Sequence, residues 1–223
     1  MMQAWMKTIQ ILIADDHELV RKGLRTVLEN QPGWQICGEA VDGREAVELA
    51  QKLQPDVIVM DVAMPELNGL EATRQIRKAI PKAEVLILTM HESEQLASEV
   101  LSAGAHGYIL KADTSRLLVS AIESLAQHKP FFTGKVSEVV LNGYLNPGDI
   151  AKGATGPVQH LTAREREIVQ LLAEGKTNKE VAVTLGVSIK TVDAHRANIM
   201  HKLDFHSVTD LVRYAIRNKI IEA

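Results

Sequence analysis

The sequence has little cysteine, few aromatic residues and no long apolar run. Its single cysteine, Cys37, excludes a disulfide framework or a thiolate metal site within one chain and is typical of a reducing cytoplasm. Aromatic residues make up 4% of the 223 residues, so any core depends on Leu, Ile, Val, Ala and Met. Apolar runs such as Val57–Met60 are far too short to span a membrane. We therefore expect a cytoplasmic protein with no membrane partner.

Charge is divided unevenly along the chain. From His160 onward there are ten Lys and Arg against eight Asp and Glu, a net charge of +2, whereas the preceding residues carry a net charge of −5. A small basic C-terminal part beside a larger acidic part favours nucleic-acid binding by the C-terminal part.

The first half alternates short apolar runs with segments of helical periodicity. Five such pairs predict a doubly wound, five-stranded parallel sheet of the flavodoxin-like kind over residues 7–128. The expected strands are Ile9–Ala14, Trp34–Ala40, Asp56–Met60, Glu84–Thr89 and Gly107–Leu110. The expected helices are Leu19–Glu29, Gly43–Gln51, Leu70–Ala79, Gln95–Ala103 and Ser115–Gln127.

The second half has only helical periodicity. Residues 129–157 are expected to be a linker with one short helix over Lys135–Tyr144, because Gly, Pro and small residues dominate its end. Residues 158–223 are expected to form an all-α domain with Gly175 and Gly186 as helix stops. Its four helices are predicted at Thr162–Glu174, Asn178–Leu185, Ser188–Lys202 and Ser207–Arg217.

Acidic and basic side chains follow the predicted strands where each strand ends. In such a sheet ligands gather at the carboxyl ends of the strands. The first strand leads into Asp15 and Asp16, the third into Asp61, and the fifth into Lys111. Three carboxylates repel one another unless a cation offsets them, and Mg²⁺ prefers oxygen ligands. We expect Asp16 and Asp61 to bind it with the backbone carbonyl of Ala63, and Asp15 to bind directly or through water.

This set of residues favours phosphoryl transfer to Asp61. A carboxylate can attack phosphorus and form an acyl phosphate, while the metal offsets the developing charge. Lys111 is expected to pair with the phosphoryl group and the Thr89 hydroxyl to donate to it. Taken singly, an Asp at a strand end is often a helix cap and a Lys is often a surface charge. His17 also lies near, but oxygen ligands already satisfy a hard cation.

The motifs Asp15-Asp16-His17, Asp61-Val62-Ala63-Met64-Pro65 with Gly69, Thr89, and Tyr108-Ile109-Leu110-Lys111 resemble the receiver domain of two-component response regulators. The resemblance implies phosphorylation of Asp61 by a sensor histidine kinase, with the receiver assisting its own Mg²⁺-dependent phosphorylation and dephosphorylation. It also implies that Thr89 moves toward the phosphoryl group and that Tyr108 changes rotamer, although Tyr108 alone could be a packing aromatic. Ala112 stands where many receivers have Pro.

The predicted C-terminal helices include a helix-turn-helix pair. Thr162 and Glu165 form a capping box, and Gly186 lies in the short turn before the long helix that starts at Ser188. With Val192 and Ile199 placed inward, a helical wheel turns the opposite face toward a major groove. That face and its flanks predict the DNA-binding residues Lys176, Lys179, Ser188, Lys190, Thr191, Asp193, Ala194, His195, Arg196, Ala197, Asn198 and Lys202.

Three of these residues keep alternative interpretations. His195 is either a packed core residue or a phosphate contact. Arg196 lies nearer the inward face. Asp193 is acidic on a groove-facing surface, so it either accepts from cytosine N4 or excludes wrong sites by repulsion.

The motifs Leu-Thr-Ala-Arg-Glu at Leu161, Gly-Lys-Thr-Asn-Lys-Glu-Val-Ala at Gly175 and Val-Ser-Ile-Lys-Thr-Val-Asp-Ala-His at Val187 resemble the LuxR-type DNA-binding domain. With the receiver, the chain is similar to the NarL/FixJ family of response regulators, which implies a transcription regulator with DNA and RNA polymerase as partners. The resemblance also implies a dimerisation helix over Ser207–Arg217. The other interpretation is that its apolar stripe closes the four-helix core, and both can hold for different parts of the stripe. That stripe comprises Val208, Leu211, Val212 and Ala215.

Other function classes fit the sequence less well. A phosphatase of the haloacid-dehalogenase kind needs a second Asp two positions after the nucleophile, where Ala63 stands. Gly175-Lys176-Thr177 is not a nucleotide-binding loop, because Gln170 stands where that motif needs glycine. A regulator that works without phosphorylation conflicts with the complete acidic pocket.

Our hypothesis is that the unphosphorylated receiver covers or misorients the recognition helix, and that phosphorylation favours a homodimer.

Overall fold

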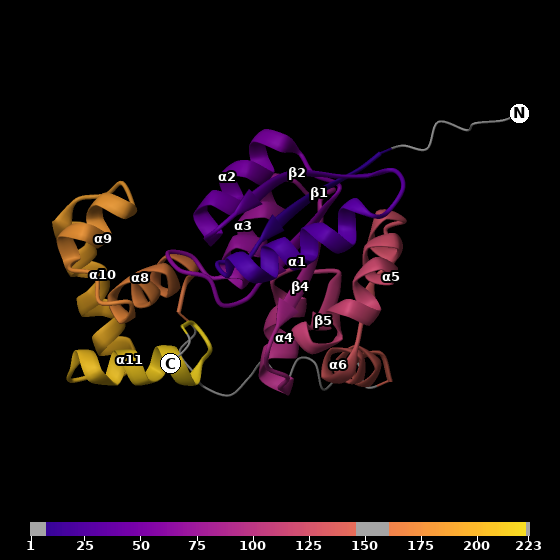
Figure 1. Cartoon of the computed structure of the whole chain (residues 1–223). Helices are drawn as coiled ribbons and strands as arrows, with labels where there is room; N and C mark the ends of the chain where they lie inside the picture. The colour runs from indigo at the N-terminus through magenta and orange to yellow at the C-terminus, as the bar shows by residue number, and fades with distance from the viewer. Residues whose placement is uncertain (1–7, 146–160, 222–223) are drawn as a thin grey trace, which may run out of the picture.

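The computed structural model describes residues 8–145 and 161–221, and it divides them between an α/β part and a smaller all-helical part (Figure 1). The N-terminal part is a parallel sheet with helices on both faces, and the C-terminal part is a group of four helices. The expected pairing of an α/β domain with an all-α domain is therefore confirmed. In the described part of the chain, no helix is both long and apolar enough to cross a membrane.

The sheet has the strand order β2-β1-β3-β4-β5-β6, and every neighbouring pair is parallel. The five predicted strands are present, and Asp61 is the last residue of β3, near the middle of the sheet. Because parallel strands end at a common edge, this order brings the ends of β1, β3, β4 and β5 together. Their bounds are β1 Ile9–Ala14, β2 Trp34–Ala40, β3 Val57–Asp61, β4 Glu84–Thr89 and β5 Gly107–Leu110.

Both faces of the sheet are covered because successive strand residues point to opposite sides. Ile11 and Ile13 of β1 pack with helices α1 and α5, whereas Leu12 and Ala14 pack with α2, α3 and α4. This burial on two sides explains why the strands are continuously apolar. The helices are α1 Glu18–Glu29, α2 Gly43–Leu53, α3 Gly69–Ala79, α4 Glu94–Ser102 and α5 Thr114–Ala126, with a 3₁₀ turn at Lys111–Asp113 before α5.

The sheet has one strand more than predicted. Phe131–Phe132 forms β6, a two-residue strand parallel to β5, in a segment predicted to be linker. Its two side chains pack into opposite core layers, and two residues are too short a run for periodicity to reveal. The predicted short helix is present as α6, Gly134–Leu145, and its Val136 is fully buried in the sheet domain. The N-terminal domain therefore extends past residue 128, whereas the Gly- and Pro-rich stretch 146–157 lies outside the described residues.

The four C-terminal helices match their predicted positions. They are α8 Ala163–Ala173, α9 Asn178–Thr184, α10 Ile189–Lys202 and α11 Val208–Arg217. Thr162 and Glu165 form the expected capping box at the start of α8. Gly175 and Gly186 follow α8 and α9 with positive φ values of 88° and 62°, which glycine adopts without a steric penalty. An apolar core shared by all four helices holds the two helix-turn-helix helices, α9 and α10, in place.

Candidate phosphoacceptor site and DNA-binding helices

Three predicted site residues meet at the carboxyl edge of the sheet. The Lys111 Nζ lies 2.8 Å from Asp15 Oδ2 and 2.9 Å from Asp61 Oδ2. Asp15 is fully buried and Asp61 is 3% exposed. The ends of β1, β3 and β5 thus place two buried carboxylates on one ammonium group, as the alternation of strands and helices predicted.

The acidic cluster has the donor set of a divalent-cation site. One ligand atom from each of Asp15, Asp16, His17 and Asp61 lies within 4.8 Å of the others. Asp15 Oδ2 has Lys111 nearby but forms no well-directed hydrogen bond, so a buried oxygen retains capacity for a ligand. The exposed His17 ring lies 2.8 Å from Asp16 Oδ1, at the rim of the cluster. These carboxylates fit a hard cation such as Mg²⁺.

Burial strongly affects the titration of this pocket. Desolvation raises the pKa of Asp61 from 3.8 to about 6, although the contact with Lys111 opposes the rise. Burial also works against the charged form of Lys111, but its contacts with Asp15 and Asp61 outweigh burial and raise the pKa of the ammonium group. The pocket therefore keeps one fixed positive charge and one carboxylate that is costly to ionise without a metal.

Asp61→Asn should change how the stability of the metal-free protein depends on pH. The folded protein binds the Asp61 proton with a pKa of about 6, above the ordinary value of 3.8, so this group stabilises the fold as pH falls through 6 toward 4. Above pH 6 the ionised group costs about 3 kcal/mol. Urea unfolding with a chelator should show Asp61→Asn more stable than wild type at pH 7.5, with the gain shrinking by pH 4.5.

The same exchange at exposed Asp204, where φ is 54° and Asn is well tolerated, is the control. Asp204→Asn should leave the difference between the two pH values unchanged. An equal gain at both pH values for Asp61→Asn would contradict the prediction, because the effect would then not depend on titration.

Thr89 lies beside Asp61, and Tyr108 contacts the same loop through His91. The Thr89 hydroxyl donates to the backbone oxygen of His91 at 3.3 Å and accepts from the His91 amide at 3.2 Å. The Tyr108 hydroxyl donates to the same His91 oxygen at 3.2 Å. Burial raises the pKa of Tyr108 to about 12, so this ring remains neutral. The loop after β4 therefore connects the predicted switch residues, while their predicted movements remain expectations.

The recognition helix α10 is accessible. Val192 and Ile199 are fully buried, as the helical wheel predicted, and Ala194, Ala197 and Asn198 on the opposite face are exposed. The receiver therefore does not cover this face, and that half of our hypothesis is wrong for this structure.

Asp193 has an intramolecular contact that the sequence did not reveal. Its Oδ1 accepts a hydrogen bond from Asn178 Nδ2 at 2.6 Å, and Asn178 Oδ1 accepts from Arg196 at 3.2 Å. Asn178 thereby connects the start of α9 to α10. Asp193 positions the recognition helix, an interpretation that neither alternative from the sequence included.

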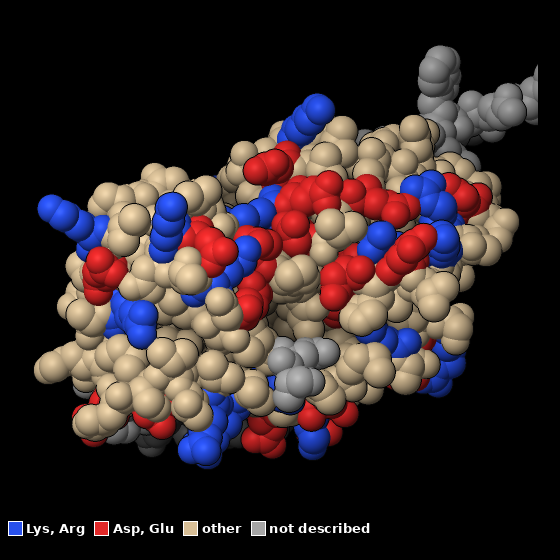
Figure 2. All heavy atoms as spheres, turned by 60° about the vertical axis from the view of Figure 1, so that its left-hand side comes forward, with Lys and Arg blue, Asp and Glu red and all other residues tan. Residues whose placement is uncertain are grey.

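The predicted phosphate-contacting lysines fall into two groups. Lys179 and Lys190 are exposed. Lys202 pairs with Glu165 at 3.0 Å inside its own domain, and Lys176 forms an ion pair with Glu66 of the receiver. Figure 2 shows basic and acidic side chains side by side where the two domains meet. One predicted DNA contact is therefore occupied by the receiver in this arrangement.

Half of the predicted dimerisation stripe is core. Leu211 and Ala215 of α11 are fully buried and pack against α8, so for these two residues the alternative prediction, that the stripe closes the domain core, describes the structure. Val208 is 45% exposed and Val212 is half-buried. The stripe divides because Leu211 and Ala215 lie on the helix face that is turned to the domain core, whereas Val208 and Val212 lie beside that face.

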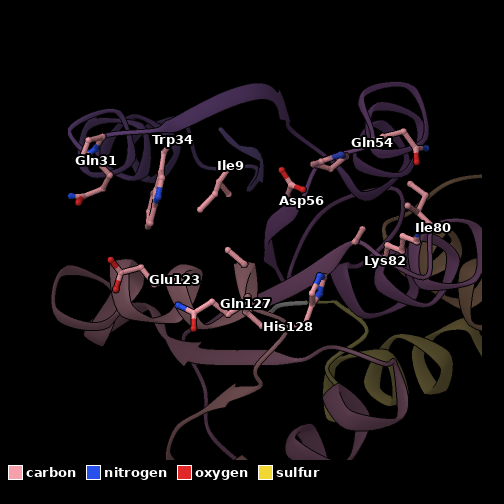
Figure 3. Close-up of a pocket in the computed structure, with 15 residues that line it drawn as sticks. Ile9, Gln31, Trp34, Gln54, Asp56, Ile80, Lys82, Glu123, Gln127 and His128 are labelled. Carbon is pink, nitrogen blue, oxygen red and sulfur yellow. The ribbon is translucent and has the colours of Figure 1, made fainter. Parts of the chain in front are cut away.

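A cavity of about 680 Å³ lies at the amino-terminal ends of the strands, on the far side of the sheet from the acidic pocket. Figure 3 shows Ile9, Trp34, Asp56 and His128 around it, and these residues come from the amino-terminal ends of strands and from the end of α5. The cavity contains none of the predicted site residues and is separate from the acidic pocket.

Comparison with known proteins agrees with the geometry. Residues 11–123 match the model of the response regulator receiver domain, and residues 159–215 match that of bacterial regulatory proteins of the luxR family. The transcriptional regulatory protein LiaR of Bacillus subtilis is 41% identical over 96% of this chain and 99% of its own length. The oxygen regulatory protein NreC of Staphylococcus carnosus is 39% identical over 96% of this chain and 100% of its own.

Solved structures of response regulators are similar to this chain in whole or in part. RcsB of Salmonella enterica serovar Typhimurium, bound to promoter P1flhDC in the presence of phosphomimetic BeF₃⁻, is 27% identical with a TM-score of 0.60, covering 93% of this chain and 98% of that chain. A LuxR-family response regulator from Aurantimonas is 35% identical with a TM-score of 0.58, covering 62% of this chain and 99% of that chain.

Fold and site together define a DNA-binding transcription regulator with a receiver domain. The chain belongs to the NarL/FixJ family of two-component response regulators.

Proposed function

We propose that Asp61 accepts a phosphoryl group from a sensor histidine kinase and that this modification controls dimerisation and sequence-specific DNA binding in the cytoplasm. The observation that carries the proposal is the convergence of Asp15, Asp61 and Lys111, with inter-atomic distances of 2.8 and 2.9 Å, at one edge of the sheet. This arrangement places a nucleophilic carboxylate (Asp61), the ammonium group of Lys111 and a second carboxylate (Asp15) in one buried pocket.

The chain's own residues perform most of the proposed step. An Asp61 oxygen attacks phosphorus and forms a P–O bond, while the bond from phosphorus to the donor's histidine nitrogen breaks and its electrons leave with that nitrogen. Lys111 already contacts Asp61 and would neutralise a phosphoryl oxygen. Thr89 would exchange its contacts with His91 for a hydrogen bond to the phosphoryl group.

The acidic cluster would hold a divalent ion for this chemistry. Mg²⁺ held by Asp15, Asp16, Asp61 and the Ala63 carbonyl would offset the negative charge that develops on phosphorus and oxygen. The absence of a second Asp at position 63 fits a phosphate that is retained as a signal.

The proposed DNA-binding surface consists of exposed residues of α10. The N-terminal turn of α10, including Ser188, Lys190 and Thr191, would contact DNA phosphates, and exposed Ala194, Ala197 and Asn198 would face bases. Val208 and Val212 would supply the apolar part of the dimer surface. RNA polymerase is a further proposed partner at the promoter.

The test measures oligomeric mass and DNA affinity of the full chain with and without a small acyl-phosphate donor and Mg²⁺. The DNA is a fragment selected for binding to the wild type. Donor and Mg²⁺ together should raise both dimer fraction and affinity. If wild type gains neither covalent phosphate nor affinity, the proposed function fails.

Lys190→Ala should weaken DNA binding without altering phosphorylation. An exposed lysine at the helix start releases counterions when it contacts phosphate, so we expect a roughly two- to tenfold loss and a salt slope smaller by about 1. Fluorescence anisotropy over a salt series measures both quantities. The matched control is Lys78→Ala, an exposed lysine on receiver helix α3. Equal losses for the two variants would remove Lys190 from the interface.

A further inference from the structure

Asn178 of the helix-turn-helix connects two oppositely charged side chains of the recognition helix. It is the first residue of α9, and its side chain contacts α10. Its Nδ2 donates to Asp193 Oδ1 at 2.6 Å, and its Oδ1 accepts from Arg196 Nη1 at 3.2 Å. A carboxylate needs a donor and a guanidinium needs an acceptor, so only this orientation of the amide satisfies both neighbours. Asn178 is therefore held at both ends.

The amide of Asn178 separates the two charges. Asp193 and Arg196 lie three residues apart on α10, a spacing at which opposite charges often pair directly. A direct carboxylate pair would occupy the fork of the guanidinium and offset its charge. Among the residues that the structure describes, Arg196 instead donates to one neutral oxygen. Its remaining N–H groups and its positive charge are therefore available for a second partner.

The surroundings of this guanidinium favour a DNA phosphate as the second partner. Arg196 is half-buried and contacts the start of α9, where the neighbouring Lys179 is exposed. It also directly precedes Ala197, which lies on the exposed face that is predicted to meet bases. Phosphate contacts fix a recognition helix on the duplex, and arginine binds phosphate oxygens through two parallel N–H bonds. A backbone phosphate of DNA therefore fits the charge, the donors and the position.

We propose that Asn178 and Asp193 position Arg196 for a DNA phosphate, so Asp193 neither reads a base nor repels wrong sites. The carboxylate fixes the amide, and the amide fixes the guanidinium before DNA binds. Fewer side-chain rotamers are then lost on binding, which favours affinity. This inference rests on the proposed DNA-binding function and gives an acidic residue on the DNA-facing helix a favourable role.

Two substitutions of Asp193 separate the three roles. Asparagine keeps an oxygen that accepts from Asn178 but removes the charge, whereas alanine removes both. We expect Asp193→Asn to bind about two- to threefold more tightly than wild type, because one negative charge near DNA is lost. Asp193→Ala should bind about three- to fivefold more weakly, because the lost hydrogen bond outweighs that gain. Fluorescence anisotropy measures both affinities with the full chain, acyl-phosphate donor, Mg²⁺ and the DNA fragment selected on the wild type.

The other two roles give different patterns. An Asp193 that repels DNA predicts tighter binding for both variants, and a carboxylate that accepts from cytosine predicts weaker binding for both. Either result would overturn the proposal. Asp204→Asn removes one charge from an exposed position after α10, so this control should change the affinity by less than about twofold.

The coupling between Asn178 and Arg196 gives a second test. Arg196→Ala should weaken binding about five- to tenfold and lower the salt slope by about 1. Asn178→Ala should also lower the slope, whereas a loss caused only by a destabilised domain would leave the slope of the folded protein unchanged. In the double variant, Asn178→Ala should add less than about twofold to the loss of Arg196→Ala, because it acts through that guanidinium. Losses that multiply would mean that Asn178 acts independently of Arg196, which contradicts the proposal.

The outcome for the wild type separates this inference from the proposed function. If the wild type binds no DNA fragment in the presence of donor and Mg²⁺, the proposed function fails and this inference fails with it. If the wild type binds and both Asp193 variants shift the affinity in the same direction, DNA binding stands and only the positioning role is refuted.

Discussion

Asp61→Asn should incorporate no phosphate from an acyl-phosphate donor under conditions in which the wild type incorporates one per chain. The exchange retains the size of the side chain but replaces the nucleophilic oxygen pair with an amide, which does not form an acyl phosphate. Lys111 keeps its 2.8 Å contact with Asp15, so the pocket remains assembled. Intact-protein mass spectrometry measures the addition directly.

A control at a second carboxylate tests whether the loss depends on the position of Asp61 or only on removal of a negative charge. Asp204→Asn removes the same charge from an exposed site in the other domain and should incorporate phosphate like the wild type. Because acyl phosphates hydrolyse readily in base while phosphate esters are more resistant, brief alkaline treatment should remove the added mass. Full incorporation into Asp61→Asn would place the acceptor elsewhere and refute the assignment.

Gly69→Ala should destabilise the receiver by about 2–4 kcal/mol, as expected for overpacking against a rigid backbone. Gly69 is the first residue of α3, and a Cβ there would lie 1.8 Å from the backbone oxygen of Asp61 and 2.9 Å from its carbonyl carbon. Neither group is the end of a flexible side chain, so the end of β3 must move. Urea unfolding should show a lower midpoint, and phosphate incorporation should slow because Asp61 is displaced.

Gly23→Ala is the matched control for that substitution. A Cβ at Gly23, in α1, meets no atom within 4 Å. Alanine in a helix interior is more favourable than glycine by up to about 1 kcal/mol, so this variant should be as stable as the wild type or more stable. If Gly69→Ala unfolds at the wild-type midpoint, the close approach of α3 to Asp61 does not constrain the site.

The fold and the acidic pocket followed from the sequence because their signals are local and repeated. Continuous apolar strands alternate with amphipathic helices, and the rules of parallel sheets then bring every strand end to one edge. The sequence alone therefore predicts that Asp15, Asp61 and Lys111 lie together. The same holds for α10, where a helical wheel separated buried Val192 and Ile199 from the exposed face.

The sequence left two features of the fold undecided. In one the sequence run was too short to show periodicity, and in the other a single apolar pattern fitted two roles. Phe131–Phe132 is too brief for periodicity, yet it completes the sheet with a sixth strand. Leu211 and Ala215 carried an apolar stripe that fits a dimer surface and a domain core equally well, and burial assigned them to the core.

The sequence by itself determined the two domains, their internal folds and the acidic pocket around Asp61, since each depends on short-range pattern and on general rules of packing. Only the tertiary structure placed Gln170 against the Met64–Asn68 loop and Lys219 beside Asp61. Gln170 lies about a hundred residues from its loop in the chain, and polar surface side chains have no periodicity that marks their partner. The arrangement of the two domains depends on specific complementarity between surfaces, which no local pattern encodes.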